Sequence, residues 1–167
     1  MDDNGEGDHG DLGDPTLPSS PVKDKSPIPG LSKLVVVQIC FRIGELVNRA
    51  SKCRSANQDA IFELYARVKS SSRDSSGRVQ HFEFMDLFKS YPPHLAGTLS
   101  GWKRGSLVDE QSAAFLAITD PKMCRCICKM RRVTKGKHTS WVLEVMSIRE
   151  TVWDNVDWIK ATAFRGQ

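Results

Sequence analysis

The sequence predicts a mainly β (α+β) domain with a helix at each end and an acidic tail in front of it. Five segments between residues 61 and 149 show the alternation of apolar and polar side chains that is typical of half-buried strands. Segments 33–53 and 152–164 repeat their apolar side chains every three or four residues, which is the period of an amphipathic helix. Residues 1–30 contain five glycines and five prolines but few aliphatic side chains.

The acidic tail, residues 1–30, contains seven Asp or Glu and two Lys, so it carries −5 while the remainder of the chain carries +9. It cannot bury enough apolar surface to offset the entropy lost on ordering, so we expect it to be disordered. Ser20 and Ser26 each precede a proline, which makes both of them candidates for phosphorylation. An acidic tail on a basic body is typical of proteins with nucleic-acid partners, although a purely solubilising tail has the same composition.

Residues 31–167 are long enough for one globular domain with its own core. A short helix at 108–117 is expected between the third and fourth strands, and the main loops are expected at 70–77 and 134–140. No apolar run approaches the roughly 18 residues that span a bilayer, so we expect no membrane partner and an intracellular location. The expected strands are 61–69, 79–88, 95–102, 124–133 and 141–149.

Cys124, Cys126 and Cys128 alternate along one predicted strand. Side chains two residues apart share a face but lie about 6.5 Å apart, too far to share one tetrahedral metal, so we interpret the three as reduced thiols packed in the core. Five cysteines, an odd number, also argue against a disulfide framework. We therefore expect no metal site and no cofactor, with a thiol- or metal-dependent regulator as the third alternative for function.

The four histidines are scattered, and the chain has no G-x-S-x-G, P-loop, G-x-G-x-x-G or H-E-x-x-H motif. We assign no catalytic residue and expect neither an enzyme nor a small-molecule substrate.

Basic residues gather on the outward faces of the predicted strands and in the loops that follow them. If the first and fourth strands belong to one barrel, they line a groove in which cations neutralise phosphates and Tyr65 stacks on a base. The alternative is an exposed polar face that contacts only water. We favour the groove and assign to it Tyr65, Arg67, Lys69, Arg73, Arg78, Arg125, Lys129, Arg131, Lys135 and Lys137.

The order of the expected elements, three strands, a helix, two strands and a terminal helix, is that of an OB-fold, a five-stranded Greek-key barrel. The segment CKMRRVTKGKHTSWVLEVMSIRETVWDNVDWIK, residues 128–160, resembles the end of OB domains in replication protein A middle subunits and telomere-capping proteins. In those proteins a basic strand and a glycine loop also lead into a Trp-containing helix. The resemblance implies single-stranded DNA binding or subunit assembly in genome maintenance.

We therefore predict a five-stranded OB-like barrel flanked by helices, in a non-enzymatic nuclear protein that contacts single-stranded DNA or RNA. The expected setting is a complex of DNA replication, repair, recombination or telomere maintenance. The alternative is a protein–protein adaptor of such a complex that does not bind nucleic acid. Trp153 and Trp158 lie about 140° apart around the terminal helix, so one can face the barrel and the other a larger subunit. An exposed Trp158 would favour the adaptor.

Overall fold

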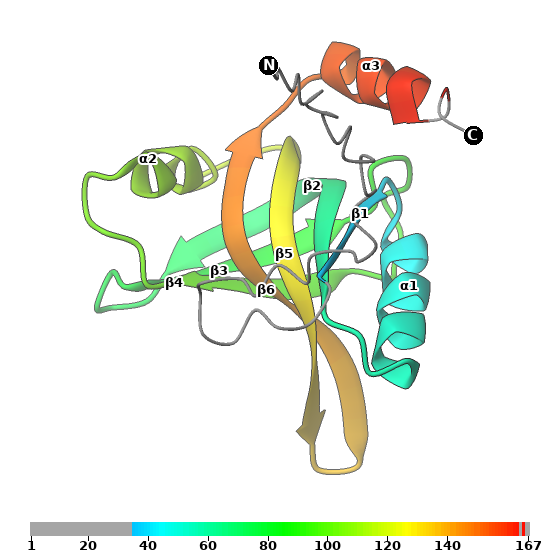
Figure 1. The fold of residues 1–167 in the computed structure, drawn as a ribbon. Helices are drawn as coiled ribbons and strands as arrows, with labels where there is room; N and C mark the ends of the chain where they lie inside the picture. The colour runs from blue at the N-terminus through cyan, green and yellow to red at the C-terminus, as the bar shows by residue number, and fades with distance from the viewer. Residues whose placement is uncertain (1–34, 164, 166–167) are drawn as a thin grey trace, which may run out of the picture. The chain divides into compact units, whose positions relative to one another are not determined.

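The computed structural model describes residues 35–163 and 165 (Figure 1). The acidic tail and its candidate phosphorylation sites, Ser20 and Ser26, lie outside the described residues, so what the sequence predicts of them stays a prediction. The strands are β1 (Val36–Cys40), β2 (Ala60–Arg73), β3 (Val79–Met85), β4 (Leu95–Ser100), β5 (Lys122–Lys135) and β6 (His138–Glu150). The helices are α1 (Ile43–Ser55), α2 (Leu107–Ala113) and α3 (Trp153–Ala163). None of the helices in the described residues is long and apolar enough to cross a membrane.

Five strands close into a barrel in the order β2–β3–β4–β6–β5, and β5 pairs back onto β2. Neighbouring strands of the barrel are antiparallel except β4 and β6, which run parallel. In the chain, α2 lies between the third and fourth strands of the barrel. This strand order with its inserted helix is that of an OB-fold. The predicted five-stranded OB-like barrel with flanking helices is therefore confirmed.

Apolar side chains of alternate residues fill the barrel, because successive side chains on a strand point to opposite faces. Cys126 of β5 lies opposite Leu64 of β2, and Cys128 lies opposite Phe62, with all four side chains buried. All five cysteines of the chain are free and buried. The prediction that the cysteines of β5 pack in the core as small apolar groups is confirmed.

The helix expected at 33–53 is wrong in its first part. Residues Val36–Cys40 form β1, which pairs in parallel with β2 as a sixth strand beside the barrel, and α1 begins only at Ile43. Three of the five residues of β1 are β-branched, and such side chains fit a pleated strand better than a helix. The start of α1 is held from outside the helix, because the Ile43 N–H donates to the buried carboxylate of Asp86 over 3.2 Å.

The loops expected at 70–77 and 134–140 are shorter than predicted because their flanking strands are longer. Residues 70–73 continue β2 and pair with β3 beyond a bulge at Lys69. Likewise, β5 and β6 pair up to a two-residue turn at 136–137. Serine and threonine carry little strand signal of their own, so the pairing partner decides these extensions.

The three helices flank different parts of the barrel, with α1 along one side, α2 on another and α3 at one end (Figure 1). The terminal helix forms within the expected 152–164, and the helix expected at 108–117 forms at 107–113. Val156 of α3 is buried in a small cluster with Tyr65 of β2 and Leu87. α3 therefore covers part of the outer surface of β2.

Candidate nucleic-acid interface

β5 and β6 continue beyond the barrel as a two-stranded extension, residues 129–141, which we call the hairpin arm (Figure 1). β5 pairs with β2 only as far as Cys128, and β6 pairs with β4 only from Val142 onward. Between these points the two strands pair with each other alone. The turn at the tip uses a left-handed backbone, which Gly136 adopts with a φ of 61°.

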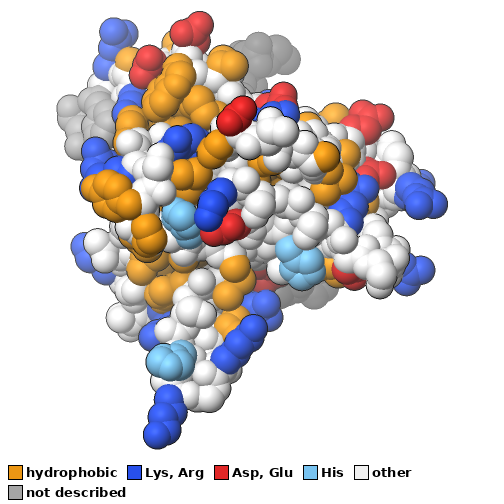
Figure 2. All heavy atoms as spheres, turned by 180° about the vertical axis from the view of Figure 1, so that it is seen from behind, with side chains coloured by type: hydrophobic (Ala, Val, Ile, Leu, Met, Phe, Trp, Pro, Cys, Tyr) orange, Lys and Arg blue, Asp and Glu red, His pale blue; other side chains and the backbone are white. Residues whose placement is uncertain are grey.

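The hairpin arm carries a high positive charge. None of its Lys or Arg side chains forms an ion pair with another residue of the described chain, and all of them are exposed. Figure 2 shows Lys, Arg and His side chains along the arm at the bottom of the view. Uncompensated charge on a protruding element attracts polyanions. The arm contains no Asp or Glu and five basic residues, Lys129, Arg131, Arg132, Lys135 and Lys137.

The structure brings together four of the ten predicted nucleic-acid ligands on the hairpin arm. Two more are exposed but lie elsewhere: Arg78 is at the β2–β3 turn, and Lys69 is at the bulge of β2. The Lys69 ammonium is 3.3 Å from the carboxylate of Glu83, so its charge is partly compensated. The four that share the arm are Lys129, Arg131, Lys135 and Lys137.

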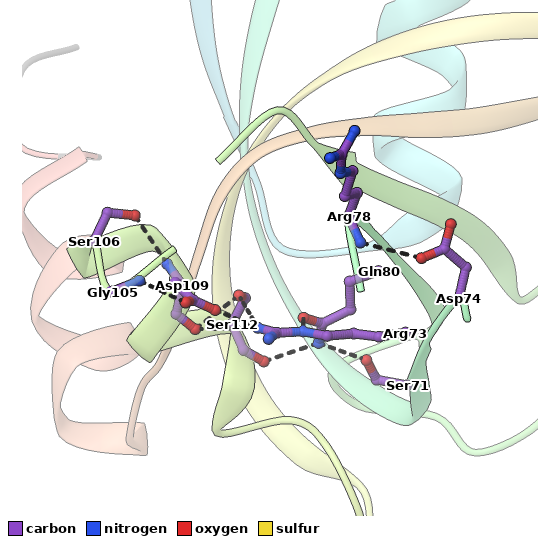
Figure 3. A network of polar contacts seen from close by, with 9 residues as sticks. All are labelled: Ser71, Arg73, Asp74, Arg78, Gln80, Gly105, Ser106, Asp109 and Ser112. Atoms are coloured by element: carbon purple, nitrogen blue, oxygen red, sulfur yellow. Dashed lines mark hydrogen bonds and ion pairs between the residues drawn. The ribbon is translucent and has the colours of Figure 1, made fainter. Parts of the chain in front are cut away.

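Arg73 is committed to a network that joins α2 to the barrel (Figure 3). Its Nη2 lies 2.8 Å from Asp109 Oδ1, and its Nε donates to the side-chain oxygen of Gln80 over 3.1 Å. The fully buried Gln80 in turn donates to the carbonyl oxygen of Ser112 over 2.9 Å. The guanidinium carbon of Arg73 also lies 4.9 Å from the ring centre of Trp102. The expectation that Arg73 is free to hold a phosphate is therefore corrected, since its partners lie within the protein.

Arg67 and Arg125 are also half-buried and engaged within the protein. Arg67 donates to the backbone oxygens of Asp86 and Lys89 over 3.1 and 2.9 Å, which holds the chain between β3 and β4. Arg125 Nε donates to Glu63 Oε1 over 2.6 Å. Both were expected on an outward face free to bind phosphate, and the partners from neighbouring elements correct that expectation.

Tyr65 is fully buried, so the prediction that it offers an exposed surface for stacking a base is wrong. Its ring stacks on Phe41 at 5.3 Å between ring centres, and its hydroxyl donates to Glu63 Oε1 over 2.7 Å. Burial and the hydrogen bond to the Glu63 carboxylate raise the pKa of Tyr65 to about 12. The strand face was predicted correctly as opposite to the barrel core, but α3 covers it at this position.

Glu63 holds Tyr65 and Arg125 together. Burial acts to raise the pKa of Glu63, but hydrogen bonds from Arg125 and Tyr65 and the charges of Arg125 and Arg149 outweigh it and hold the pKa below its usual value. The carboxylate therefore stays ionised and neutralises Arg125, which removes that residue from the positive surface.

The outward faces of β3 and β4, where OB-folds commonly bind oligonucleotides, are poor in the groups that such binding uses. Neither strand contains a Lys or Arg, and Phe82 and Phe84 of β3 are buried. The acid of this face, Glu83, is occupied by Lys69 and by His94 at 3.2 Å. Cations and stacking surfaces for a strand must therefore come from other elements.

Exposed aromatic side chains lie on α3 and on the chain between β3 and β4: Phe88, Tyr91, Trp153 and Trp158, which we call the aromatic patch. Phe88 and Trp153 are in contact, with ring centres 5.8 Å apart. Trp158 is 68% exposed, and Trp153 is 46% exposed, so both predicted partner-binding residues reach the surface. Lys160 Nζ lies 4.3 Å from the ring centre of Phe88. Figure 2 shows hydrophobic side chains interspersed with basic ones at its upper left, over this end of the molecule.

A surface pocket of about 470 Å³ separates the end of α1 from the base of the hairpin arm. Trp141 and Arg132 meet beside it, opposite each other across the two strands, with the guanidinium carbon 5.4 Å from the ring centre. Neither residue was assigned to the site from the sequence. A two-residue turn at Gly136 would have revealed the pair, because it sets the register of the strands. The lining residues are Ala50, Cys53, Arg54, Asn57, Gln58, Asp59, Ala60, Phe62, Lys129, Met130 and Trp141.

Within the described residues, no group of three or more His, Cys, Asp or Glu is arranged to hold a metal ion. The fold and the charged arm together define the chain as an OB-fold protein with a basic β-hairpin extension. No family model matches the chain, and no curated protein matches it.

Solved structures with a similar arrangement include three with low sequence identity. The putative aspartyl-tRNA synthetase from Leishmania major Friedlin is 13% identical over 80% of this chain and 24% of that one, with a TM-score of 0.44. Yeast Stn1 and Ten1 give 8% identity over 75% and 87%, with a TM-score of 0.44. RecJ in complex with Mn²⁺ from Thermus thermophilus gives 14% over 71% and 16%, with a TM-score of 0.41. This chain thus spans about a quarter of the synthetase and less of RecJ.

Proposed function

We propose that this OB-fold protein binds single-stranded DNA or RNA through its hairpin arm and catalyses no reaction. We place it in the nucleus, in a complex of DNA replication, repair, recombination or telomere maintenance. The observation that supports binding is the arm itself, with five exposed basic side chains, no acid and no ion pair to another described residue. Such a surface gains affinity by releasing the counterions that surround the phosphates of a strand.

An unpaired strand suits this arm better than a duplex, because the basic groups lie close to a large aromatic ring. Arg132 contacts Trp141 at the base of the arm, and the pocket beside them opens to the surface. Unpaired bases can stack on such a ring, whereas the bases of a duplex are already stacked on one another.

Binding of a fluorescent single-stranded oligonucleotide across a salt series tests the proposal. The plot of log affinity against log salt should be linear, with a slope that loses about 0.7 for each phosphate contact removed. Lys135→Ala with Lys137→Ala should therefore give a shallower slope than the wild type. The control is Lys103→Ala with Arg104→Ala, which removes the same charge from exposed positions between β4 and α2. Absence of binding at low salt, or equal slopes for the two double variants, would overturn the proposal.

The second candidate function is that of an adaptor that docks a larger protein subunit, and the observation that favours it is the exposed Trp158. The aromatic patch has a basic rim, since Lys160 lies over Phe88 and Lys89 Nζ lies 5.3 Å from the ring centre of Tyr91. Aromatic centres with flanking cations bind partners that combine apolar and acidic groups. We propose a subunit with an acidic contact surface as the occupant.

A photo-crosslinking amino acid in place of Trp158 tests the adaptor in cells. The captured subunit should form a complex with the purified chain, and Lys89→Glu with Lys160→Glu should weaken that complex by charge repulsion. A concentration-dependent dimer of the purified chain that Trp158→Ser abolishes would instead assign the patch to a second copy. An unchanged complex with the charge-reversed variant would show that the aromatic patch is not the contact.

A further inference from the structure

The pocket beside the hairpin arm has the size and position of a ligand site on the side of the barrel where the arm begins. Its volume of about 470 Å³ falls within the range of about 300–1,000 Å³ that small-ligand sites occupy. One wall is the last turn of α1 and the start of β2, and the other is the base of the arm. A strand held by the arm therefore passes this pocket.

The pocket combines the three kinds of group that hold one nucleotide. Trp141 and Phe62 give it aromatic surface, and Arg54 and Lys129 give it cations. The third kind is a set of polar side chains at the end of α1, described in turn below. Aromatic rings stack on bases, cations neutralise phosphates, and amide or carboxylate groups bond to base edges.

The polar side chains of the pocket have free hydrogen-bonding capacity. Asn57, Gln58 and Asp59 are all exposed, and their side chains make no hydrogen bond to another residue of the described chain. Asn57 has a φ of 49° as the residue that ends α1, so the local backbone accounts for its place in the chain but leaves its amide unused. Asp59 repels a phosphate, which favours placing the base rather than the phosphate at this end of the pocket.

We propose that this pocket holds one unpaired base of the bound strand, with Trp141 as its stacking surface. The proposal rests on the proposed function, since it specifies where that same strand runs. The base lies between the arm and the end of α1, its edge faces Asn57 and Gln58, and its flanking phosphates lie against Lys129 and Arg132. The strand thereby avoids the outward faces of β3 and β4, which carry neither Lys nor Arg.

Trp141→Ala tests the proposal in the full chain, with a fluorescein-labelled oligothymidine as the probe. Affinity should fall about fivefold to a hundredfold, which is the range for losing one base–aromatic stack. The salt slope should not change, because no cation has been removed, whereas Lys129→Ala should lower the slope by about 0.7. Trp141→Phe should retain most of the affinity because it keeps an aromatic ring. Trp158→Ala is the matched control, since its exposed indole lies on α3 and should not affect this site.

An abasic oligonucleotide of equal length separates stacking from a structural role of Trp141. It presents phosphates without bases, so the wild type and Trp141→Ala should bind it with equal affinity. A deficit that persists with the abasic probe would show that Trp141 only shapes the arm, and would overturn the proposal. If Trp141→Ala does not fold, Trp141→Phe and a cross-link from a 5-iodouracil base give the same information.

The position of the cross-link distinguishes failure of this proposal from failure of the proposed function. A cross-link to Trp141 or to residues 54–62 supports the pocket. A cross-link to β3 or β4, together with unchanged affinity of Trp141→Ala, overturns the pocket but leaves binding by the arm intact. A wild-type chain that binds no oligonucleotide at low salt overturns both.

Discussion

Arg73 at the end of β2 and Asp109 in α2 lie 2.8 Å apart, although 36 residues separate them in the chain. Both side chains are mostly buried by the contact, and the guanidinium also satisfies the buried amide of Gln80. This pair shows how the barrel and its inserted helix are joined by polar groups rather than by apolar packing alone. Several basic residues that the sequence assigns to nucleic acid have roles of this internal kind.

Arg73→Ala should destabilise the fold without weakening oligonucleotide binding by the arm. The substitution leaves Gln80 Oε1 and the Asp109 carboxylate without their partner, and an unpaired buried polar group costs about 1–3 kcal/mol. Urea denaturation measures the loss, with the exposed Arg78→Ala as the control that removes the same charge. Unchanged stability with a shallower salt slope would return Arg73 to the binding site.

Glu63→Gln should flatten the dependence of stability on acid. The pKa of Glu63 is lower in the folded chain than its usual value of about 4.3, so the ionised group stabilises the fold above that pH. This stabilisation is lost as the pH falls from the usual value through the lowered one. The free energy of unfolding of the wild type should therefore fall more steeply than that of Glu63→Gln between roughly pH 5 and the lowered pKa. Urea midpoints at a series of pH values measure the difference, and parallel curves would contradict it.

Gly97→Ala should destabilise the barrel, whereas Gly44→Ala should not. A Cβ at Gly97 would lie 2.6 Å from Phe84 Cε2 and 3.3 Å from Leu143 Cβ, and such overpacking costs about 1–3 kcal/mol. A Cβ at Gly44 meets no atom within 4 Å and lies in α1, where alanine is favoured by about 0.5–1 kcal/mol. Thermal melting of the two variants compares them directly. Equal melting temperatures would show that Phe84 moves aside at little cost.

The cysteines should react with a thiol reagent only when the chain unfolds. Burial raises the pKa of the Cys40 thiol to about 12 and raises the pKa values of Cys124 and Cys126 well above the usual range, so little thiolate forms at neutral pH. We expect a slow reaction in buffer and five rapid equivalents in denaturant, measured with a chromogenic disulfide. A fast equivalent in buffer would identify a cysteine that the fold exposes transiently, and substitution of Cys53 by Ser would show whether it is that residue.

The alternation of side chains predicts the strands because it depends only on neighbours in the chain. Cys124, Cys126 and Cys128 illustrate this, since a two-residue period places all three on the buried face of β5 whatever the rest of the fold does. The same reasoning failed at β1, where apolar residues suit either a helix or a strand. The choice there was made by pairing with β2, which begins twenty residues further along the chain.

The sequence alone therefore determined the OB-like order of elements and a basic arm, because a run of Lys and Arg without acids stays charged in any fold. The tertiary structure alone decided which basic residues are free and which aromatic rings are exposed. Tyr65 and Arg73 lie on strands where they were expected, but α3 covers the first and α2 supplies the partner of the second. The physical reason is that burial and pairing are set by contacts between distant segments, which local periodicity does not encode.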